Sequence, residues 1–188
     1  MFEIRWHGRG GMGAVTAADI TASAAIKAGY YALAFPEFGA ERRGAPVTAY
    51  TRIDERVIYD RSPIEEPDAV VVLDPTMITS PRVLAGIKDG GYLIVNTAKD
   101  PKQVVEEVGL KGRKLTVATV DATDLAMKVF NLPIVNTAMV GALISTTKLL
   151  PLDRVLEVVN EKFSGRIASL NAQLIKQAYE LVKVVKHE

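Results

Sequence analysis

A glycine-rich turn between two apolar segments constrains this chain more than any other feature. The turn, Gly8-Arg9-Gly10-Gly11-Met12-Gly13, follows an extended apolar run at 2–7 and precedes an alanine-rich run at 14–28. Glycine has no Cβ, so a segment with four glycines can adopt positive φ angles and bring its backbone close to a ligand. A strand that enters a helix through such a turn directs backbone N–H groups and the helix dipole at one point. The segment therefore predicts a strand–turn–helix unit that binds phosphate.

The motif leaves two interpretations of this turn open. Gly8, Gly10 and Gly13 match G-x-G-x-x-G in the strand-then-helix context that a dinucleotide fingerprint requires. The same glycines are also typical of a turn that only packs a helix closely against a strand. A Walker A loop is excluded, because no Lys-Ser or Lys-Thr follows the last glycine at the required spacing.

Composition excludes several classes of function. With 23 basic and 22 acidic residues the net charge is +1, which argues against a nucleic-acid-binding protein. No apolar run approaches the roughly 20 residues of a membrane span, and no basic-then-apolar signal segment opens the chain. We expect a cytoplasmic protein with no membrane partner. A length of 188 residues predicts one domain, 1–188.

The side chains that most often perform catalysis are scarce. The chain has no cysteine, so it offers no thiolate to zinc or to an iron–sulfur cluster. Its two histidines, His7 and His187, provide little material for a metal site or a catalytic triad. We therefore predict no catalytic residue and no metal site within this chain.

Alternation of strands and helices predicts an α/β fold. Apolar runs indicate strands, and capping residues, prolines and glycines mark helices between them, one of which is expected to run from Ser80-Pro81 to Gly90-Gly91. The fold predicted is a three-layer α/β/α sandwich with a mostly parallel mixed sheet and a Rossmann-like first βα turn. The expected strands are 31–35, 69–73, 92–96 and 115–120, and the other helices are 12–28, 100–109 and 121–130.

Two further expectations concern the middle and the end of the chain. A strand at 46–54 followed by Val57-Ile58-Tyr59 suggests a β-hairpin, which is why the sheet is expected to be mixed. From Asn136, a candidate helix cap, only helices are expected. Apolar residues recur at helical spacing from Ile167 to Val185, so the C-terminus is predicted to be helical.

The segment at 36–46 has no helix or strand periodicity and carries two adjacent arginines. Arg42 and Arg43 provide planar donors that suit a phosphate or a carboxylate, and Glu37 or Glu41 could orient them. The alternative is a solvated charge cluster without a ligand, since most exposed ion pairs contribute little.

Three segments together resemble the gamma subunit of 2-oxoacid:ferredoxin oxidoreductases, most closely the pyruvate (pyruvate synthase) type. They are the glycine turn, the segment 39–47 with its Glu41-Arg42-Arg43-Gly44 motif, and the segment 136–143, which begins Asn136-Thr137. The resemblance covers nearly the whole chain, and the Glu-Arg-Arg-Gly motif is its most specific part. Met12 stands where many relatives carry glutamine, which leaves this position a backbone role only.

The resemblance implies a non-catalytic subunit of a larger enzyme. Such complexes convert a 2-oxoacid, coenzyme A and oxidised ferredoxin into acyl-CoA, carbon dioxide and reduced ferredoxin. Thiamine diphosphate, Mg²⁺ and [4Fe–4S] clusters are implied on other subunits, and the implied partners are the alpha, beta and delta subunits and, through the complex, ferredoxin. Anaerobic metabolism is the implied setting.

The residues implied to bind coenzyme A or to order its cleft are Gly8, Arg9, Gly10, Gly11, Met12, Gly13, Glu41, Arg42, Arg43, Asn136 and Thr137. The arginines could instead form a contact between subunits that keeps the thiamine site closed. A different class of protein also stays open, a free-standing Rossmann-type NAD(P) oxidoreductase or nucleotide sensor, in which Glu37 would bind the ribose. A third possibility is an assembly scaffold with a vestigial cleft.

Overall fold

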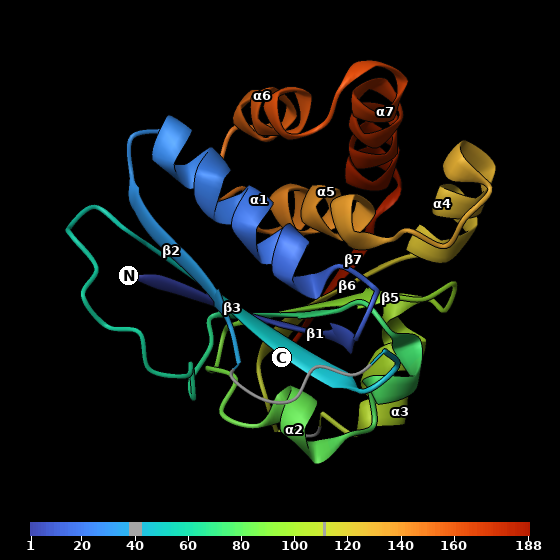
Figure 1. Ribbon diagram of the computed structural model, residues 1–188. Helices are drawn as coiled ribbons and strands as arrows, with labels where there is room; N and C mark the ends of the chain where they lie inside the picture. Colours follow the sequence, from blue (N-terminus) through green and yellow to red (C-terminus); the bar gives the residue numbers. More distant parts are fainter. Residues whose placement is uncertain (38–42, 111) are drawn as a thin grey trace.

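A mixed β-sheet forms the middle layer of the molecule (Figure 1). The computed structural model describes residues 1–37, 43–110 and 112–188. Within these ranges seven strands form one sheet in the order β2-β3-β1-β4-β5-β6-β7. The strands are β1 (Phe2–Arg9), β2 (Tyr31–Pro36), β3 (Pro46–Asp54), β4 (Ala69–Val72), β5 (Tyr92–Asn96), β6 (Leu115–Val120) and β7 (Lys183–His187).

Five of these strands point in one direction. The central strands β1, β4, β5 and β6 pair in parallel, whereas β3 is antiparallel to both β1 and β2, and β7 is antiparallel to β6. The predicted mostly parallel mixed sheet is therefore confirmed. The chain leaves β1 toward one face and β4 toward the other, so the carboxyl ends of these two strands form a topological switch point, where open α/β sheets commonly bind ligands.

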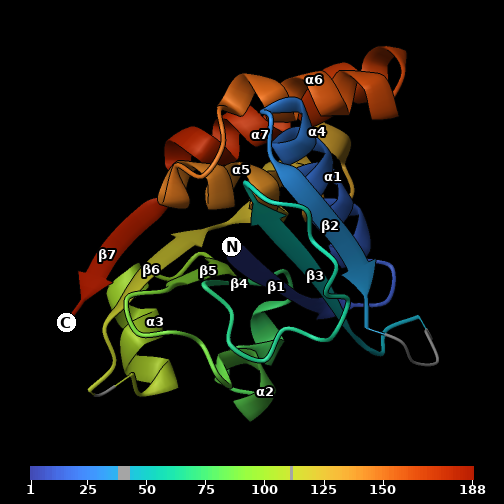
Figure 2. The same ribbon diagram turned by 90° about the vertical axis from the view of Figure 1, so that its left-hand side faces the viewer.

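Helices cover both faces of the sheet, which confirms the predicted three layers (Figures 1 and 2). We call the face with more helices the upper face and the other the lower face, as they lie in Figure 1. The upper helices are α1 (Ala14–Lys27), α4 (Ala122–Phe130), α5 (Asn136–Thr147), α6 (Leu152–Lys162) and α7 (Gly165–Leu181). The lower elements are the 3₁₀ turn η1 (Pro75–Met77), α2 (Pro81–Leu84) and α3 (Pro101–Val108).

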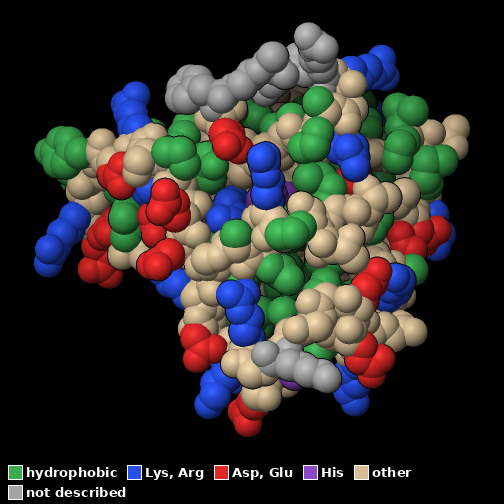
Figure 3. Space-filling model, turned by 90° about the horizontal axis from the view of Figure 1, so that it is seen from below, with side chains coloured by type: hydrophobic (Ala, Val, Ile, Leu, Met, Phe, Trp, Pro, Cys, Tyr) green, Lys and Arg blue, Asp and Glu red, His purple; other side chains and the backbone are tan. Residues whose placement is uncertain are grey.

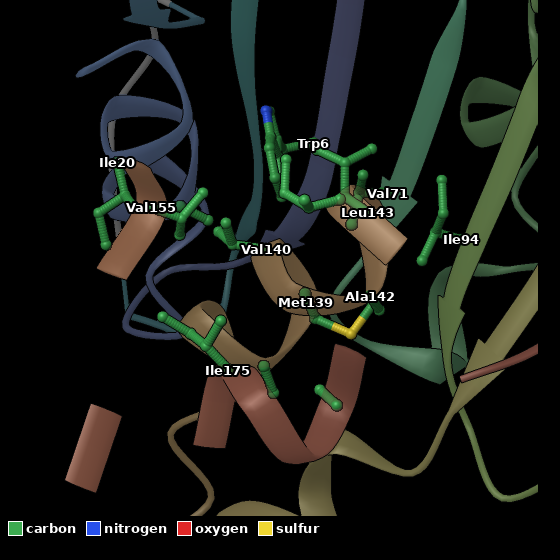
Figure 4. Packing of buried hydrophobic residues seen from close by; sticks show 14 of the residues in the cluster. Trp6, Ile20, Val71, Ile94, Met139, Val140, Ala142, Leu143, Val155 and Ile175 are labelled. Atoms are coloured by element: carbon green, nitrogen blue, oxygen red, sulfur yellow. The ribbon is translucent and has the colours of Figure 1, made fainter. Parts of the chain in front are cut away.

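The upper core is centred on α5, which lies between the sheet and α7. The first nine residues of α5 are all buried. A Cβ on Gly141 would lie 2.4 Å from the carbonyl oxygen of Ile175, so only glycine allows α5 and α7 to cross at this distance. Figure 4 shows α5 side chains next to strand residues, and the labelled members include Met139, Val140, Ala142, Leu143, Trp6, Val71 and Ile94.

The hairpin expected at 46–59 is wrong. Val57-Ile58-Tyr59 forms no strand, and the Tyr59 side chain is 87% exposed. The partner of β3 in the antiparallel pair is instead β2, which precedes it. A long β3 buried in the sheet already has β1 and β2 on its two edges, so no edge is left for a third strand.

Two predicted helix ends are also corrected. The helix from Pro81 ends at Leu84 and does not reach Gly90. The last helix ends at Leu181, and the residues after it form β7. In β7 the side chain of Val185 packs on the lower core while Val184 is 49% exposed, the alternation of a strand.

Among the helices of the described ranges, none combines the length and the apolar character that crossing a membrane requires.

Candidate functional site

The glycine turn joins β1 to α1 and is fastened to the segment before β3. Gly11 and Gly13 have φ angles of +93° and +82°, which L-residues rarely adopt. The Gly10 N–H donates to the Ala45 carbonyl at 2.8 Å, and the Gly44 N–H donates to the Gly10 carbonyl at 3.2 Å. The sequence prediction of a strand, a tight turn and a helix is confirmed, and the turn is held against 43–45.

Asn136 lies directly beside this turn although it is more than 120 positions away in the chain. A Cβ on Gly13 would lie 2.5 Å from Asn136 Nδ2, so only glycine permits this approach. Asn136 is 8% exposed, and its Oδ1 accepts the Thr137 N–H at 2.9 Å. Nδ2 has no acceptor among the residues that the structure describes. Two of the segments singled out in the sequence therefore meet at one place.

The N-terminus of α1 opens onto a cavity of about 330 Å³. The N-cap position is Gly13, which has no side chain to accept a bond from the first helical turn. Within the described part of the chain, the N–H groups of Gly11 and Gly13 also have no acceptor. The cavity is lined by Arg9, Gly10, Gly11, Gly13, Ala14, Val15, Thr16 and Val47. Backbone donors and the positive end of the helix dipole make this cavity suitable for an anion.

The guanidinium of Arg9 forms its contacts with other groups of the protein. Its Nε pairs with the Asp74 carboxylate at 2.5 Å, and its terminal nitrogens donate to the Gly44 carbonyl and to Thr76 Oγ1, each at 3.3 Å. Burial raises the pKa of Asp74, but the bonds from Thr76 and Arg9 outweigh it and the pKa is lowered overall. This ion pair links the ends of β1 and β4, so it spans the switch point where a dinucleotide would bind in a Rossmann fold.

Three other predicted positions, Gly8, Met12 and Thr137, are occupied by packing or by the sheet. Gly8 lies within β1 opposite Val47. Met12 packs its side chain against the upper core, which agrees with a backbone role at this position. Thr137 is fully buried, and its hydroxyl donates to Asn171 Oδ1 at 2.9 Å, so it contributes to the packing of α5 on α7.

The arginine segment is only partly described. Arg43 is exposed and forms an isolated parallel bridge with Gly10, which places it at the glycine turn. Glu41 and Arg42 lie outside the described residues. Glu37 follows β2 and lines a different cavity, on the lower face, so the structure does not bring it to the glycine turn.

This lower cavity is the feature that the sequence did not predict. It has a volume of about 630 Å³ and lies under β1 and β3, between 63–65 and α2. Figure 3 shows the lower face, where charged side chains of both signs are interspersed. Arg5 and His7 of β1 form its floor and are 6% and 4% exposed. The signal was present in β1, whose polar residues alternate with Ile4 and Trp6, but alternation alone does not distinguish a cavity floor from a solvated face.

Arg5 holds the walls of this cavity together. Its guanidinium donates to the carbonyls of Ile64 and Glu65 on one side and to those of Arg82, Val83 and Ala85 on the other, at distances from 2.5 to 3.4 Å. Burial lowers the pKa of Arg5, yet a guanidinium is so basic that it keeps its charge.

His7 is neutral because it is buried and because it lies beside the charged Arg5. Arg5 Nε donates to His7 Nε2 at 3.0 Å. Burial first, and then the charge of Arg5, lower the pKa of His7 from 6.5 to about 3. Since Nε2 accepts a hydrogen bond, the single ring proton lies on Nδ1.

Comparison with known proteins identifies the family. The model of the pyruvate ferredoxin/flavodoxin oxidoreductase family matches residues 3–181. The chain belongs to this family. The pyruvate/ketoisovalerate oxidoreductases common subunit gamma of Thermococcus kodakarensis is 52% identical over the full length of both chains. Pyruvate synthase subunit PorC of Thermotoga maritima is 43% identical and covers 97% of this chain and 95% of its own.

Solved structures agree with this assignment to the oxidoreductase family. The crystal structure of the pyruvate oxidoreductase subunit PORC of Thermotoga maritima superposes with a TM-score of 0.85 at 41% identity, and covers 97% of both chains. A 2-oxoglutarate:ferredoxin oxidoreductase from Magnetococcus marinus shares the fold, with a TM-score of 0.73 at 18% identity over 30% of its chain. The resemblance to gamma subunits inferred from the sequence is confirmed, and the NAD(P) alternative is not favoured.

Proposed function

We propose that the chain is the gamma subunit of a pyruvate:ferredoxin oxidoreductase and works together with alpha, beta and delta subunits in the cytoplasm. The complex would oxidise pyruvate with coenzyme A to acetyl-CoA and carbon dioxide and would pass the electrons to ferredoxin. Support comes from full-length relatives that are gamma or PorC subunits of such enzymes. The proposed role is non-catalytic, because the described side chains at the glycine turn include no histidine or cysteine to act as a base or a nucleophile.

The cofactors of the reaction would lie on the partner subunits. Iron–sulfur clusters are bound by cysteine thiolates, and this chain has no cysteine. In the described ranges, no group of three or more histidine, aspartate or glutamate side chains is arranged to hold a metal ion such as Mg²⁺. The residues of this chain therefore do not fit the clusters, and we assign those clusters, thiamine diphosphate and Mg²⁺ to the other subunits.

Within the complex, we assign the glycine turn to the coenzyme A cleft. The observation that carries this assignment is the set of unpaired donors at the start of α1. The N–H groups of Gly11 and Gly13 and the Nδ2 of Asn136 face no acceptor in the described structure. Arg43, bridged to Gly10, and its neighbour Arg42 would add guanidinium donors for a phosphate.

The test is to replace Arg42 and Arg43 by alanine in the assembled enzyme. Loss of a hydrogen bond to a charged group costs about 1.5–3 kcal/mol, so the apparent KM for coenzyme A should rise roughly tenfold or more while the KM for pyruvate stays unchanged. Arg166→Ala, an exposed arginine in α7, is the matched control and should leave both constants unchanged.

Two other outcomes would contradict the assignment. Failure of the double variant to assemble, with unchanged coenzyme A affinity in the fraction that assembles, would make the arginines a subunit contact. An unchanged KM in a fully assembled enzyme would indicate a scaffold with a vestigial cleft.

The subunit assignment itself is tested by anaerobic purification of the tagged chain from its native cells. Co-purification of cysteine-rich and thiamine-binding chains, with the brown absorbance of iron–sulfur clusters and reduction of ferredoxin by pyruvate and coenzyme A, is the expected result. A colourless protein without partners would contradict it.

A further inference from the structure

The cavity on the lower face has a floor built by two neighbouring strands. In the antiparallel pair of β1 and β3, Arg5 lies opposite Tyr50 and His7 lies opposite Thr48. Residues that face each other in such a pair point to the same side of the sheet. All four side chains line the cavity of about 630 Å³, a size typical of small-molecule sites.

The floor carries the positive charge of Arg5, which forms no ion pair with a described carboxylate, although the more distant Glu37 also acts on it. Five backbone carbonyls and the neutral ring of His7 surround the Arg5 guanidinium. Within the described ranges, no aspartate or glutamate lies at ion-pair distance from Arg5, whereas the neighbouring buried Arg52 pairs with Glu3. Because a buried charge is costly without a counter-charge, this arrangement favours an anion in the cavity.

Two donors on this floor belong to largely buried side chains that line the cavity, and neither has a hydrogen-bond partner in the described structure. His7 is 4% exposed, and the bond from Arg5 to Nε2 leaves Nδ1–H as the group that it offers to the cavity. Tyr50 is also 4% exposed and lines the cavity, and its hydroxyl makes no hydrogen bond to any described residue. Burial and the charge of Glu37 raise the pKa of Tyr50, so its hydroxyl keeps its proton at neutral pH.

We propose that this cavity binds a carboxylate through His7 Nδ1–H and the Tyr50 hydroxyl, with the charge of Arg5 behind them. Two donors match the two oxygens of a carboxylate, and a charge of −1 is what Arg5 balances. Arg82, Glu37 and Glu65 also line the cavity, so the charges of its lining balance, which disfavours a phosphate dianion more than a carboxylate monoanion. Apolar wall residues such as Ile64 and Met77 suit the carbon skeleton of an organic acid. This proposal does not depend on the role assigned to the glycine turn.

The carboxylate has two possible sources, a free organic acid or an aspartate or glutamate of a partner subunit. For the first, the full chain labelled with ¹⁵N-histidine would be titrated with sodium acetate and sodium pyruvate at constant ionic strength. The chain has only two histidines, and the His187→Gln variant assigns the ring signals of His7. We expect a saturable shift of the Nδ1 resonance with either acid, and none with acetamide or sodium chloride.

The variant that tests the site is Tyr50→Phe, which removes one hydroxyl and keeps the ring that packs on Phe35. It should weaken the binding of acetate roughly tenfold or more, the effect of losing a hydrogen bond to a charged group. Tyr59→Phe is the matched control, because Tyr59 is 87% exposed and does not line the cavity.

For the second source, a carboxylate of a partner subunit, the measured quantity is the affinity of the chain for its partner subunits. If neither acid shifts His7 but the Tyr50→Phe chain joins its partner subunits at least tenfold more weakly than the Tyr59→Phe chain, the carboxylate belongs to a partner. The proposal is overturned if neither acid binds and Tyr50→Phe assembles normally. It is also overturned if acetate shifts His7 equally in the Tyr50→Phe variant, or if sodium chloride produces the same saturable shift as acetate.

Discussion

Replacing Gly13 by alanine tests whether the glycine turn is shaped by its contact with Asn136. At φ +82° an alanine occupies the left-handed region at a cost of about 1–2 kcal/mol. Its Cβ would also lie 2.5 Å from Asn136 Nδ2 and 3.0 Å from two further atoms of that side chain. Overpacking of this kind costs about 1–3 kcal/mol. We therefore expect Gly13→Ala to lower the free energy of unfolding by about 2–5 kcal/mol.

Gly11 provides the matched control within the same turn. Its φ is +93°, but a Cβ there meets no atom within 4 Å, so Gly11→Ala should cost only the backbone term of about 1–2 kcal/mol. Urea unfolding can be followed by the fluorescence of Trp6, the single tryptophan, which is fully buried. An Asn136→Ala background removes the Nδ2 and Cγ contacts but keeps the Cβ at 3.0 Å, so the cost of Gly13→Ala should fall toward, but not fully to, that of Gly11→Ala. Equal losses for the two glycine variants in the original background would refute the reasoning.

Three further predictions concern buried polar groups. Asp74→Asn removes the charge that pairs with Arg9 and should lower the free energy of unfolding by about 1–3 kcal/mol in urea melts at pH 7. His7 has a pKa of about 3 when folded and 6.5 when unfolded, so below pH 6.5 only the unfolded chain gains a proton and stability falls by about 1.4 kcal/mol per pH unit. That slope between pH 6.5 and 5 should be absent in His7→Gln. Trp6→Phe removes a 3.0 Å bond to Thr51 and leaves a small void, which should cost about 1–3 kcal/mol by circular dichroism.

The central strands were predictable from the sequence because strands buried on both faces consist of uninterrupted apolar residues. β4 is fully buried, and its sequence, Ala-Val-Val-Val, is an uninterrupted apolar run of the kind found in parallel strands covered on both faces. Local capping signals marked both ends of α3 correctly, whereas the cap predicted at Asn136 is one residue late, because Val135 is the N-cap of α5. Asp100 forms a capping box with Gln103, and Gly109 ends α3 in the left-handed conformation that favours glycine.

The C-terminal strand, β7, was not predictable because only one of its two edges is paired, with β6, and the other edge has no described strand beside it. One of its faces is also exposed. Its short sequence, Lys-Val-Val-Lys-His, also continues the apolar stripe of α7 by chance, since Leu181 and Val185 are four positions apart. Only pairing with β6, some 70 residues earlier, decides between helix and strand.

The lower cavity was hidden for a related reason. A charged residue in a strand of alternating polarity is predicted to be exposed to solvent. Arg5 is instead buried, with 6% of its surface exposed. What buries it is a set of carbonyls at 64–65 and 82–85, nearly 60 and 80 positions away. Backbone carbonyls carry no side-chain identity, so no residue pattern records that they will surround a guanidinium.

The position of one strand explains why a matching dinucleotide fingerprint does not imply a dinucleotide site here. In a Rossmann fold the strand that follows the first helix lies next to β1, so its terminal acid reaches the ribose. In this chain β3 lies between β1 and β2, and Glu37 at the end of β2 lines the lower cavity. On the other side of β1, the pair of Arg9 with Asp74 spans the switch point. Access to the unpaired N–H groups of the turn is left on the side of Val47 and Arg43, and we infer that any phosphate at this turn approaches from there.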